Sequence, residues 1–157
     1  YIPQNESIFS GLSCEQNLKA IAEIVIKNHE QRQNIIENLL TEFSLNDVRR
    51  VLAKNLSGGQ KKKLVIARSL INKPKILLMD EVFSAIDPIT IEVIKEIIVN
   101  LQKRGISILI TDHAFDNVLQ ISDKVYILAD GQIVSSGKPQ EIVKDQQARK
   151  IYFGDTY

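Results

Sequence analysis

The first half of the chain carries its apolar residues at helical spacing, every three or four positions. In residues 29–43 the apolar side chains that would share one helix face are Ile35, Ile36, Leu39, Leu40 and Phe43. Ser13 and Gln16 form a capping-box pattern ahead of another such stretch. Four helices are predicted in this half: residues 15–26, residues 29–43, residues 45–51, and a helix that runs from Ser57 to just before Pro74.

From Lys75 onward the pattern changes to short apolar runs separated by helical stretches. The predicted strands are residues 75–79, 107–111 and 124–128. The helices expected between and after them are residues 88–103, 114–121, 139–144 and 147–152. Strands that alternate with helices are typical of a parallel sheet covered on both faces. The pair Asp130-Gly131 predicts a hairpin that joins the last of these strands to a further one.

These patterns predict an α/β fold in which residues 1–74 are mainly helical and residues 75–157 form a core with a parallel sheet. The 157 residues, 44% hydrophobic and 25% charged, are enough for one domain with an apolar core. No apolar run approaches the ~20 residues that a membrane-spanning helix needs. The single cysteine, Cys14, excludes a disulfide within the chain and suits a reducing compartment.

The net charge is only +1, but Lys and Arg are concentrated in residues 1–75 and Asp and Glu in residues 76–157. The basic half could face anionic phosphate or lipid, or could be an ordinary solvated surface, and charge alone leaves both open. The run Lys61–Lys63 is interpreted chiefly as solvated surface charge. The alternative is that it adds positive potential near a bound phosphate.

The stretch Leu56-Ser57-Gly58-Gly59-Gln60 precedes the fourth predicted helix. Ser57 is a good N-cap, and two adjacent glycines let another group approach the backbone closely. A helix that begins here presents unpaired N–H groups and the positive end of its dipole, which suit a phosphate. The alternative is a Gly-rich turn that only caps a buried helix.

Two acidic residues, Asp80 and Glu81, follow the apolar run Ile76–Met79 directly. Ligands of open α/β sheets bind at the carboxyl ends of the strands. Two carboxylates are costly inside a core and natural at a metal site, and adjacent strand residues point to opposite sides and can serve different roles. The alternative is a solvated pair that ends the strand.

Together these motifs resemble the nucleotide-binding subunits of ABC transporters. LSGGQ is similar to the signature motif of that family, and ILLMDE to its Walker B strand. The resemblance runs from Tyr1 to the C-terminus. With the triplet Thr111–His113 and the tail IYFGDTY, the chain is most similar to the ATPases of bacterial lipopolysaccharide export.

For catalysis, the resemblance implies that Asp80 holds Mg²⁺ and that Glu81 polarises the water that attacks the γ-phosphate. His113 resembles the switch histidine that touches this phosphate. Gln4 resembles the Q-loop glutamine, which lies at the end of a first strand and contacts Mg²⁺ and the attacking water. Taken alone, His113 or Gln4 would be an ordinary structural or solvated residue. Val82 stands where the family often has proline, a difference expected to loosen the turn.

For assembly, the resemblance implies that the signature residues bind ATP held by a second subunit: Ser57, Gly58, Gly59 and Gln60. Asp87 resembles the D-loop residue that crosses to the opposite nucleotide site. Asp87 before Pro88 also fits the N-cap and first turn of the next helix. The resemblance therefore implies a homodimer with ATP between its subunits.

The sequence contains no G-x-x-x-x-G-K-[ST] phosphate loop. In the family that loop lies N-terminal to the Q-loop, so the chain is expected to be the C-terminal portion of a P-loop NTPase domain. Its first residue is Tyr1 rather than Met, which we interpret as a fragment. ATP binding by the chain alone is therefore expected to be weak, because the loop's lysine and N–H groups are missing.

The resemblance implies an ATP-binding, ATP-hydrolysing subunit that uses ATP and Mg²⁺. Lipopolysaccharide export is the first choice of transport, and import of branched-chain amino acids is the second. Partners would be a second copy and transmembrane permease subunits, at the cytoplasmic face of the inner membrane. A truncated, non-catalytic module that dimerises or occupies the permease is the competing interpretation. An ABC ATPase that works on DNA or ribosomes is disfavoured, so no nucleic acid is expected.

Overall fold

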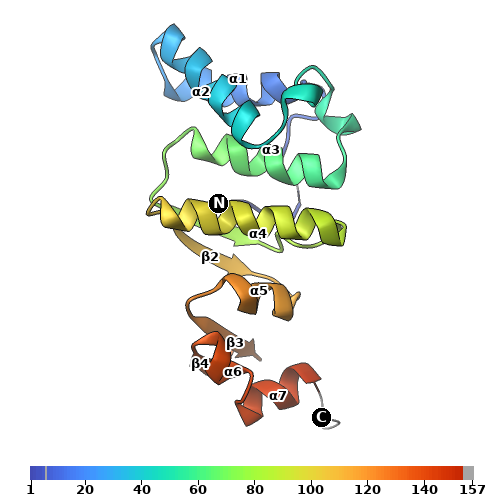
Figure 1. The fold of residues 1–157 in the computed structure, drawn as a ribbon, viewed down its shortest axis with the longest axis vertical. Helices are drawn as coiled ribbons and strands as arrows, with labels where there is room; N and C mark the ends of the chain where they lie inside the picture. Colours follow the sequence, from blue (N-terminus) through green and yellow to red (C-terminus); the bar gives the residue numbers. More distant parts are fainter. Residues whose placement is uncertain (6, 154–157) are drawn as a thin grey trace. The chain divides into compact units, whose positions relative to one another are not determined.

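The computed structural model describes residues 1–5 and 7–153. The tail similarity over residues 151–157 therefore falls partly outside the described residues. The chain divides into two compact units, Tyr1–His113 and a second that begins at Ala114. Figure 1 labels helices and strands of both units. Among residues 1–5 and 7–153, no helix is both long and apolar enough to span a bilayer.

The first unit contains both the helical block and a short parallel sheet. Its elements are α1 (Cys14–Val25), α2 (His29–Glu42), the 3₁₀ turns η1 (Asn46–Val48) and η2 (Ala53–Asn55), α3 (Gly58–Leu70), β1 (Ile76–Asp80), α4 (Pro88–Lys103) and β2 (Ser107–Thr111). The predicted helix over residues 45–51 is wrong in extent, because only a single 3₁₀ turn forms there. The other predicted helices are confirmed.

Side-chain caps fix where these helices begin. Ser13 caps α1 through a capping box with Gln16, and Asn28 caps α2 by accepting from an N–H of its first turn. Helix α1 then packs on both α2 and α3. The fully buried side chains of this helical core include Leu18, Ala22, Leu40, Leu64 and Ile66. Apolar periodicity and capping together account for the block.

In the sheet, β1 and β2 run parallel, with Leu78 opposite Leu109. Ile2 extends the sheet on the other side of β1: its N–H donates to the Leu78 carbonyl at 2.7 Å, and its carbonyl accepts from the Asp80 N–H at 2.9 Å. Gln4 therefore follows a segment that pairs parallel with β1, in agreement with the strand that the resemblance implies before it. Three parallel segments thus point their carboxyl ends to the same edge.

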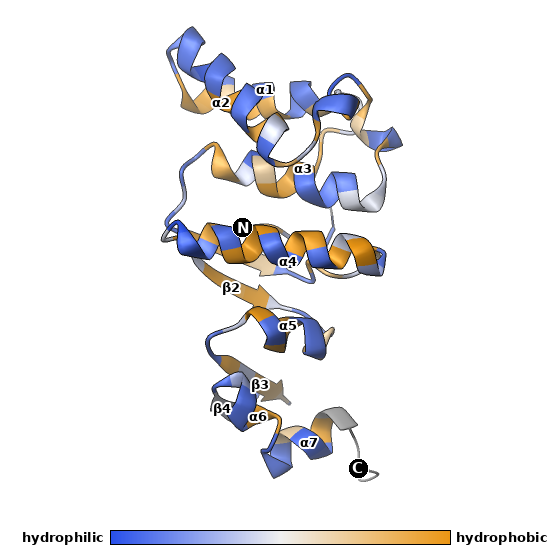
Figure 2. Cartoon of the chain, viewed as in Figure 1, coloured by the Kyte–Doolittle hydropathy of each residue, from blue (hydrophilic) through white to orange (hydrophobic). Residues whose placement is uncertain are grey.

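Helix α4 packs against β2 through an amphipathic surface. Figure 2 shows apolar and polar residues alternating along this helix, and Ile94, Ile98 and Leu101 are buried. Leu77 and Met79 of β1 are buried as well. The alternate residues of the two strands remain exposed, among them Ile76, Leu78 and Leu109. The sheet was predicted to be covered by helices on both faces, and in the described part of the chain this cover is incomplete.

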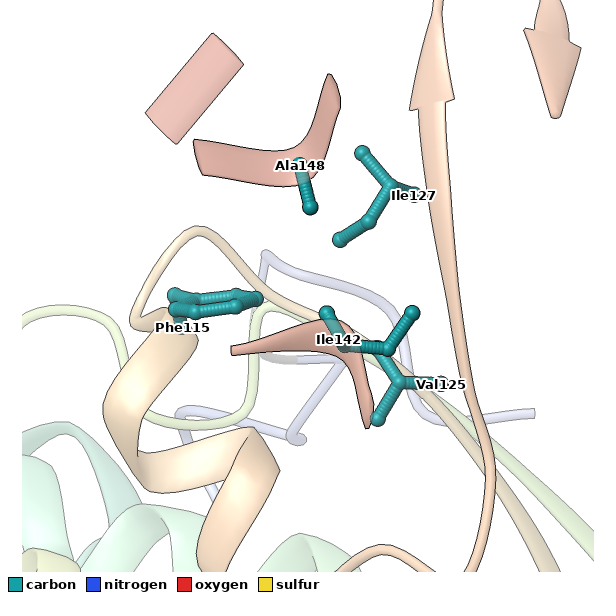
Figure 3. Packing of buried hydrophobic residues seen from close by; sticks show 5 residues of the cluster. All are labelled: Phe115, Val125, Ile127, Ile142 and Ala148. Atoms are coloured by element: carbon teal, nitrogen blue, oxygen red, sulfur yellow. The ribbon is translucent and has the colours of Figure 1, made fainter. Parts of the chain in front are cut away.

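The second unit is a hairpin with three helices around a small core. Its elements are α5 (Phe115–Ile121), β3 (Val125–Ala129), β4 (Gln132–Gly137), α6 (Pro139–Ile142) and α7 (Gln146–Phe153). The core consists of Phe115, Val125, Ile127, Ile142 and Ala148, which Figure 3 shows together. The predicted hairpin is confirmed, with Asp130 and Gly131 at φ values of 49° and 76°.

In the second unit, β3 pairs antiparallel with β4. The turn at Asp130 and Gly131 places β4 beside β3 immediately. A hairpin occupies only one edge of β3, so the prediction that this strand joins the parallel sheet stays a prediction. The division between the two units falls at residues 113 and 114, whereas the predicted domain boundary at residues 74 and 75 stays a prediction.

Candidate functional site

Glu81 lies where β1 ends, in a backbone conformation that is unusual for a residue with a side chain. Its φ is 46°, in the left-handed region. Its N–H still donates to the Thr111 carbonyl at 2.7 Å, which continues the pairing with β2. Its own carbonyl accepts from the Ser84 hydroxyl at 2.8 Å and from the Lys62 ammonium at 3.3 Å. The Ser84 N–H adds a fourth contact, to the same carbonyl at 3.3 Å. Contacts of this kind hold a strained backbone in place.

The Glu81 carboxylate meets two of the predicted site residues. Its Oε2 accepts a hydrogen bond of 2.5 Å from Gln4 Nε2. The same oxygen lies 3.8 Å from His113 Nδ1, which is beyond hydrogen-bond distance. The side chains of Glu81 and His113 are 33% and 71% exposed, so this group of three is open to solvent. The structure therefore brings together residues 4, 81 and 113 at one sheet edge.

Asp80 lies beside this group with two donors on its carboxylate. The Thr111 hydroxyl donates to Oδ1, and the Tyr1 hydroxyl donates to Oδ2 at 3.1 Å. The hydrogen bond to Asp80 raises the pKa of the Tyr1 phenol. Neither Tyr1 nor Thr111 was predicted to contact the site. Each carboxylate oxygen can accept more than one bond, so Asp80 keeps capacity for a further ligand.

The donor set suits Mg²⁺ better than a metal held by protein ligands alone. Mg²⁺ usually keeps several waters and binds one or two carboxylates together with substrate phosphates. Asp80 offers such a carboxylate, with the Gln4 amide at the same edge. Among residues 1–5 and 7–153, no group of three or more His, Cys, Asp and Glu side chains could hold a metal. A single carboxylate with free lone pairs suits a cation that reaches the site together with a phosphate ligand.

Asp112 is a site residue that the sequence did not reveal. Its side chain is completely buried, and its Oδ2 accepts from the Phe83 N–H at 2.8 Å. Its Oδ1 lies 3.8 Å from His113 Nδ1. Val82 and Phe83 are buried as well, so the segment after Glu81 is anchored despite the valine. In the sequence, the one sign that Asp112 belongs to the site is its position between a strand end and His113.

The turn at Ser57 begins α3 as predicted. The Gln60 N–H donates to Ser57 Oγ at 3.2 Å, and the Ser57 N–H donates to Gln60 Oε1 at 2.9 Å. Ser57 and Gly58 are exposed, and Gly59 is buried. The N–H groups of a first helical turn have no partner within the helix. The turn can therefore present donors and a positive dipole end to an anion.

The two glycines also let α3 pack closely on the segment after β1. A Cβ on Gly59 would lie 2.6 Å from Thr90 Cγ2, and one on Gly58 would lie 3.2 Å from the Ala85 carbonyl oxygen. The close approach predicted for these glycines is thus made by the chain itself. This observation supports a packing role beside any role in binding.

Asp87 caps α4 next to this contact. Its carboxylate accepts from the Thr90 N–H at 3.0 Å and from the Thr90 hydroxyl at 2.6 Å. These hydrogen bonds hold the pKa of Asp87 below its usual value. Thr90 therefore connects Asp87 to Gly59. The signature turn and Asp87 form one cluster, and Gln4, Asp80, Glu81 and His113 form another.

Comparison with known proteins gives consistent matches. The family model described as "ABC transporter" matches residues 1–84. The chain is 37% identical to the lipopolysaccharide export system ATP-binding protein LptB of Haemophilus influenzae, over all of this chain and 66% of that protein. It is 40% identical to LptB of Acidithiobacillus ferridurans, of which it covers 65%. An uncharacterised ABC transporter ATP-binding protein of Rhizobium meliloti is 38% identical, with 58% covered.

The solved structures that resemble this chain also come from ABC transporters. The chain superposes on cbiO1 of Clostridium perfringens, part of the ABC transporter complex cbiONQ, with a TM-score of 0.83 at 26% identity. That match covers 96% of this chain and 62% of cbiO1. A nucleotide-free ATP-binding cassette from an ABC transporter gives a TM-score of 0.83 at 25% identity, with 98% and 68% covered. The chain thus spans about two thirds of the length of these proteins or somewhat less.

Proposed function

The chain belongs to the ABC transporter family, and on that premise we propose that it forms part of a subunit that binds and hydrolyses ATP to drive transport. The sequence-based resemblance to this family, and to the ATPases of lipopolysaccharide export within it, is confirmed. So is the predicted ABC ATPase fold.

The arrangement of Gln4, Glu81 and His113 carries the proposal. Enzymes that transfer phosphoryl groups act mainly by positioning reactants and neutralising charge. In our proposal, the Glu81 carboxylate accepts a proton from the attacking water, and the Gln4 amide holds that carboxylate in place. The His113 imidazole, exposed beside both, hydrogen-bonds to the γ-phosphate. The hydrogen bond of 2.5 Å between Gln4 and Glu81 supports this division of roles.

ATP would bind as its Mg²⁺ complex, with Asp80 as the protein carboxylate and the Gln4 side chain nearby. The metal, when bound, neutralises charge on the phosphate oxygens. Asp80 is held for this task by the Tyr1 and Thr111 hydroxyls, which leave its remaining lone pairs for metal-bound water or the metal.

The signature residues Ser57–Gln60 would bind phosphate of an ATP held by a second copy of the intact protein. Their turn, in which Ser57 and Gly58 are exposed, supports a site shared between two subunits. Asp87, in the cluster next to this turn, would face the same interface. We therefore propose a homodimer attached to transmembrane permease subunits at the cytoplasmic face of the membrane.

Lipopolysaccharide export is the transport process that we propose. Two relatives at 37% and 40% identity carry that function in their names. Import of branched-chain amino acids is the alternative. Purification of the permease partners together with the intact protein would test this part, and recovery of amino-acid permeases instead would contradict it.

The direct test of the proposed activity is the Glu81→Gln variant of the intact protein, expressed from its complete gene. General bases typically contribute 10²–10⁴-fold to rate, so ATP turnover should fall by at least roughly 100-fold. Glu96→Gln, on the exposed side of α4, is the matched control and should leave turnover unchanged. Turnover that survives Glu81→Gln, or a wild-type protein that does not hydrolyse ATP, would contradict the proposal.

A further inference from the structure

Lys62 is a charged side chain that the fold buries almost completely. It is 4% exposed, whereas Lys61 and Lys63 on either side are half-buried. The prediction that the whole run Lys61–Lys63 is solvated surface charge is therefore wrong for its middle member. Burial of an ammonium group is costly unless it is hydrogen-bonded, so its position calls for a specific partner.

That partner is the backbone of the proposed catalytic residue. Lys62 Nζ donates to the Glu81 carbonyl oxygen at 3.3 Å, across 19 positions of sequence. The Ser84 hydroxyl donates to the same oxygen at 2.8 Å. The Ser84 N–H also donates to this oxygen, at 3.3 Å, so Lys62 and Ser84 together supply all its donors that the structure shows among the described residues. These contacts lie within the first unit.

The orientation of this carbonyl matters because Glu81 is in the left-handed region, with φ at 46°. A residue with a side chain stays there only when its surroundings hold it. If φ of Glu81 relaxed to a negative value, the Cα–Cβ bond would turn, and the carboxylate would leave Gln4 Nε2. The donors on the carbonyl hold the backbone in its present conformation and therefore help to set the direction of the carboxylate.

We propose that Lys62 is a positioning residue for ATP hydrolysis, which acts by fixing the backbone of Glu81. The inference rests on the proposed function of Glu81. Lys62 also lies on α3, five residues after Ser57, so it ties the catalytic glutamate to the helix whose first turn carries the signature residues. It contacts neither nucleotide nor water in this role.

The test compares three variants of the intact protein for kcat and for the KM of ATP. Lys62→Met keeps the length and burial of the side chain and removes the donor. Misplacing one catalytic group typically costs on the order of tenfold or more in rate, so we expect kcat to fall by that factor with KM within about twofold. Lys62→Arg, which keeps a buried donor, should recover part of the loss. Lys63→Met is the matched control and should behave as wild type.

Equal kcat for Lys62→Met and Lys63→Met would overturn the inference, and so would a loss that Lys62→Arg does not relieve. If Lys62→Met does not fold, Ser84→Ala decides, because it removes the other side-chain donor of the same carbonyl. It should lower kcat with little change in KM, and an unchanged kcat would overturn the inference. These outcomes are distinct from failure of the proposed function, in which Glu81→Gln retains turnover.

Discussion

Gly59 is a point of close contact between α3 and α4. The residue is buried, and Thr90 fills the space that a side chain would need. Thr90 is itself held by two hydrogen bonds to Asp87, so it cannot move away freely. At this position the identity of one residue decides how closely two segments pack.

We predict that Gly59→Ala destabilises the protein by about 1–3 kcal/mol, the usual cost of overpacking. The new Cβ would lie 2.6 Å from Thr90 Cγ2. In a Thr90→Ala background the same change should cost less, because Cγ2 and Oγ1 are gone. Urea unfolding of the four proteins measures both effects. Gly11→Ala is the control, since nothing lies within 4 Å of its Cβ position.

At the scale of single residues, the sequence predicted the two carboxylates and the motif residues as site candidates. It did not predict the residues that hold them in place. Asp80 and Glu81 stand out because two carboxylates follow an apolar run. Asp112 and Lys62 act through contacts to main-chain atoms 29 and 19 positions away. Such contacts depend on how the segments pack, and no local pattern encodes them.

Helix α1 shows how an element is fixed by its first residues. Cys14 is fully buried, and its N–H donates to the Val51 carbonyl at 3.0 Å. Arg49 adds an ion pair to Glu15 at 2.6 Å. The start of α1 is thus joined to residues 49–51. Caps and apolar periodicity predicted this helix, because both signals are local in sequence.

For the strand β3, the informative signal lies in the turn that follows it. Its short apolar run is compatible with either a parallel or an antiparallel neighbour. The pair Asp130-Gly131 predicted the antiparallel partner, and β4 pairs with β3 in that way. The run alone does not reveal which strand would lie at the other edge of β3.

Cys14 supplies a test of the α1 packing. Burial raises the pKa of its thiol to about 11, from an ordinary 9.0. Because the thiolate is the reactive form, we predict that iodoacetamide modifies native Cys14 at pH 8 more slowly than the urea-unfolded chain by roughly 100-fold or more. Mass spectrometry of the Cys14 peptide measures both rates. Similar rates would contradict the packing of α1.

The same shift predicts the effect of pH on stability. The folded state binds the thiol proton more tightly than the unfolded state does. The contribution of Cys14 is therefore complete below the unfolded pKa and declines as the pH rises from 9 towards 11. The difference in unfolding free energy between wild type and Cys14→Ala should shrink over that range, and a constant difference would contradict it.

At the scale of the whole molecule, every predicted site residue lies in the unit Tyr1–His113. Within this unit the signature turn and the glutamate group form separate clusters, linked through Lys62. An ATP shared between two copies would use the turn of one copy and the glutamate of the other. The sequence could suggest this arrangement only through family resemblance, because a single chain does not encode its partner's position.

Mixing two inactive variants of the intact protein tests this shared site most directly. Ser57→Arg blocks the signature turn and Glu81→Gln removes the base, so each homodimer has two defective sites. A mixed dimer would have one site with an unaltered turn and an unaltered glutamate. Because half of randomly paired dimers are mixed, ATP hydrolysis should return to roughly a quarter of wild type. If hydrolysis stays at the level of the separate variants although mixed dimers form, the signature turn does not serve the glutamate of its partner.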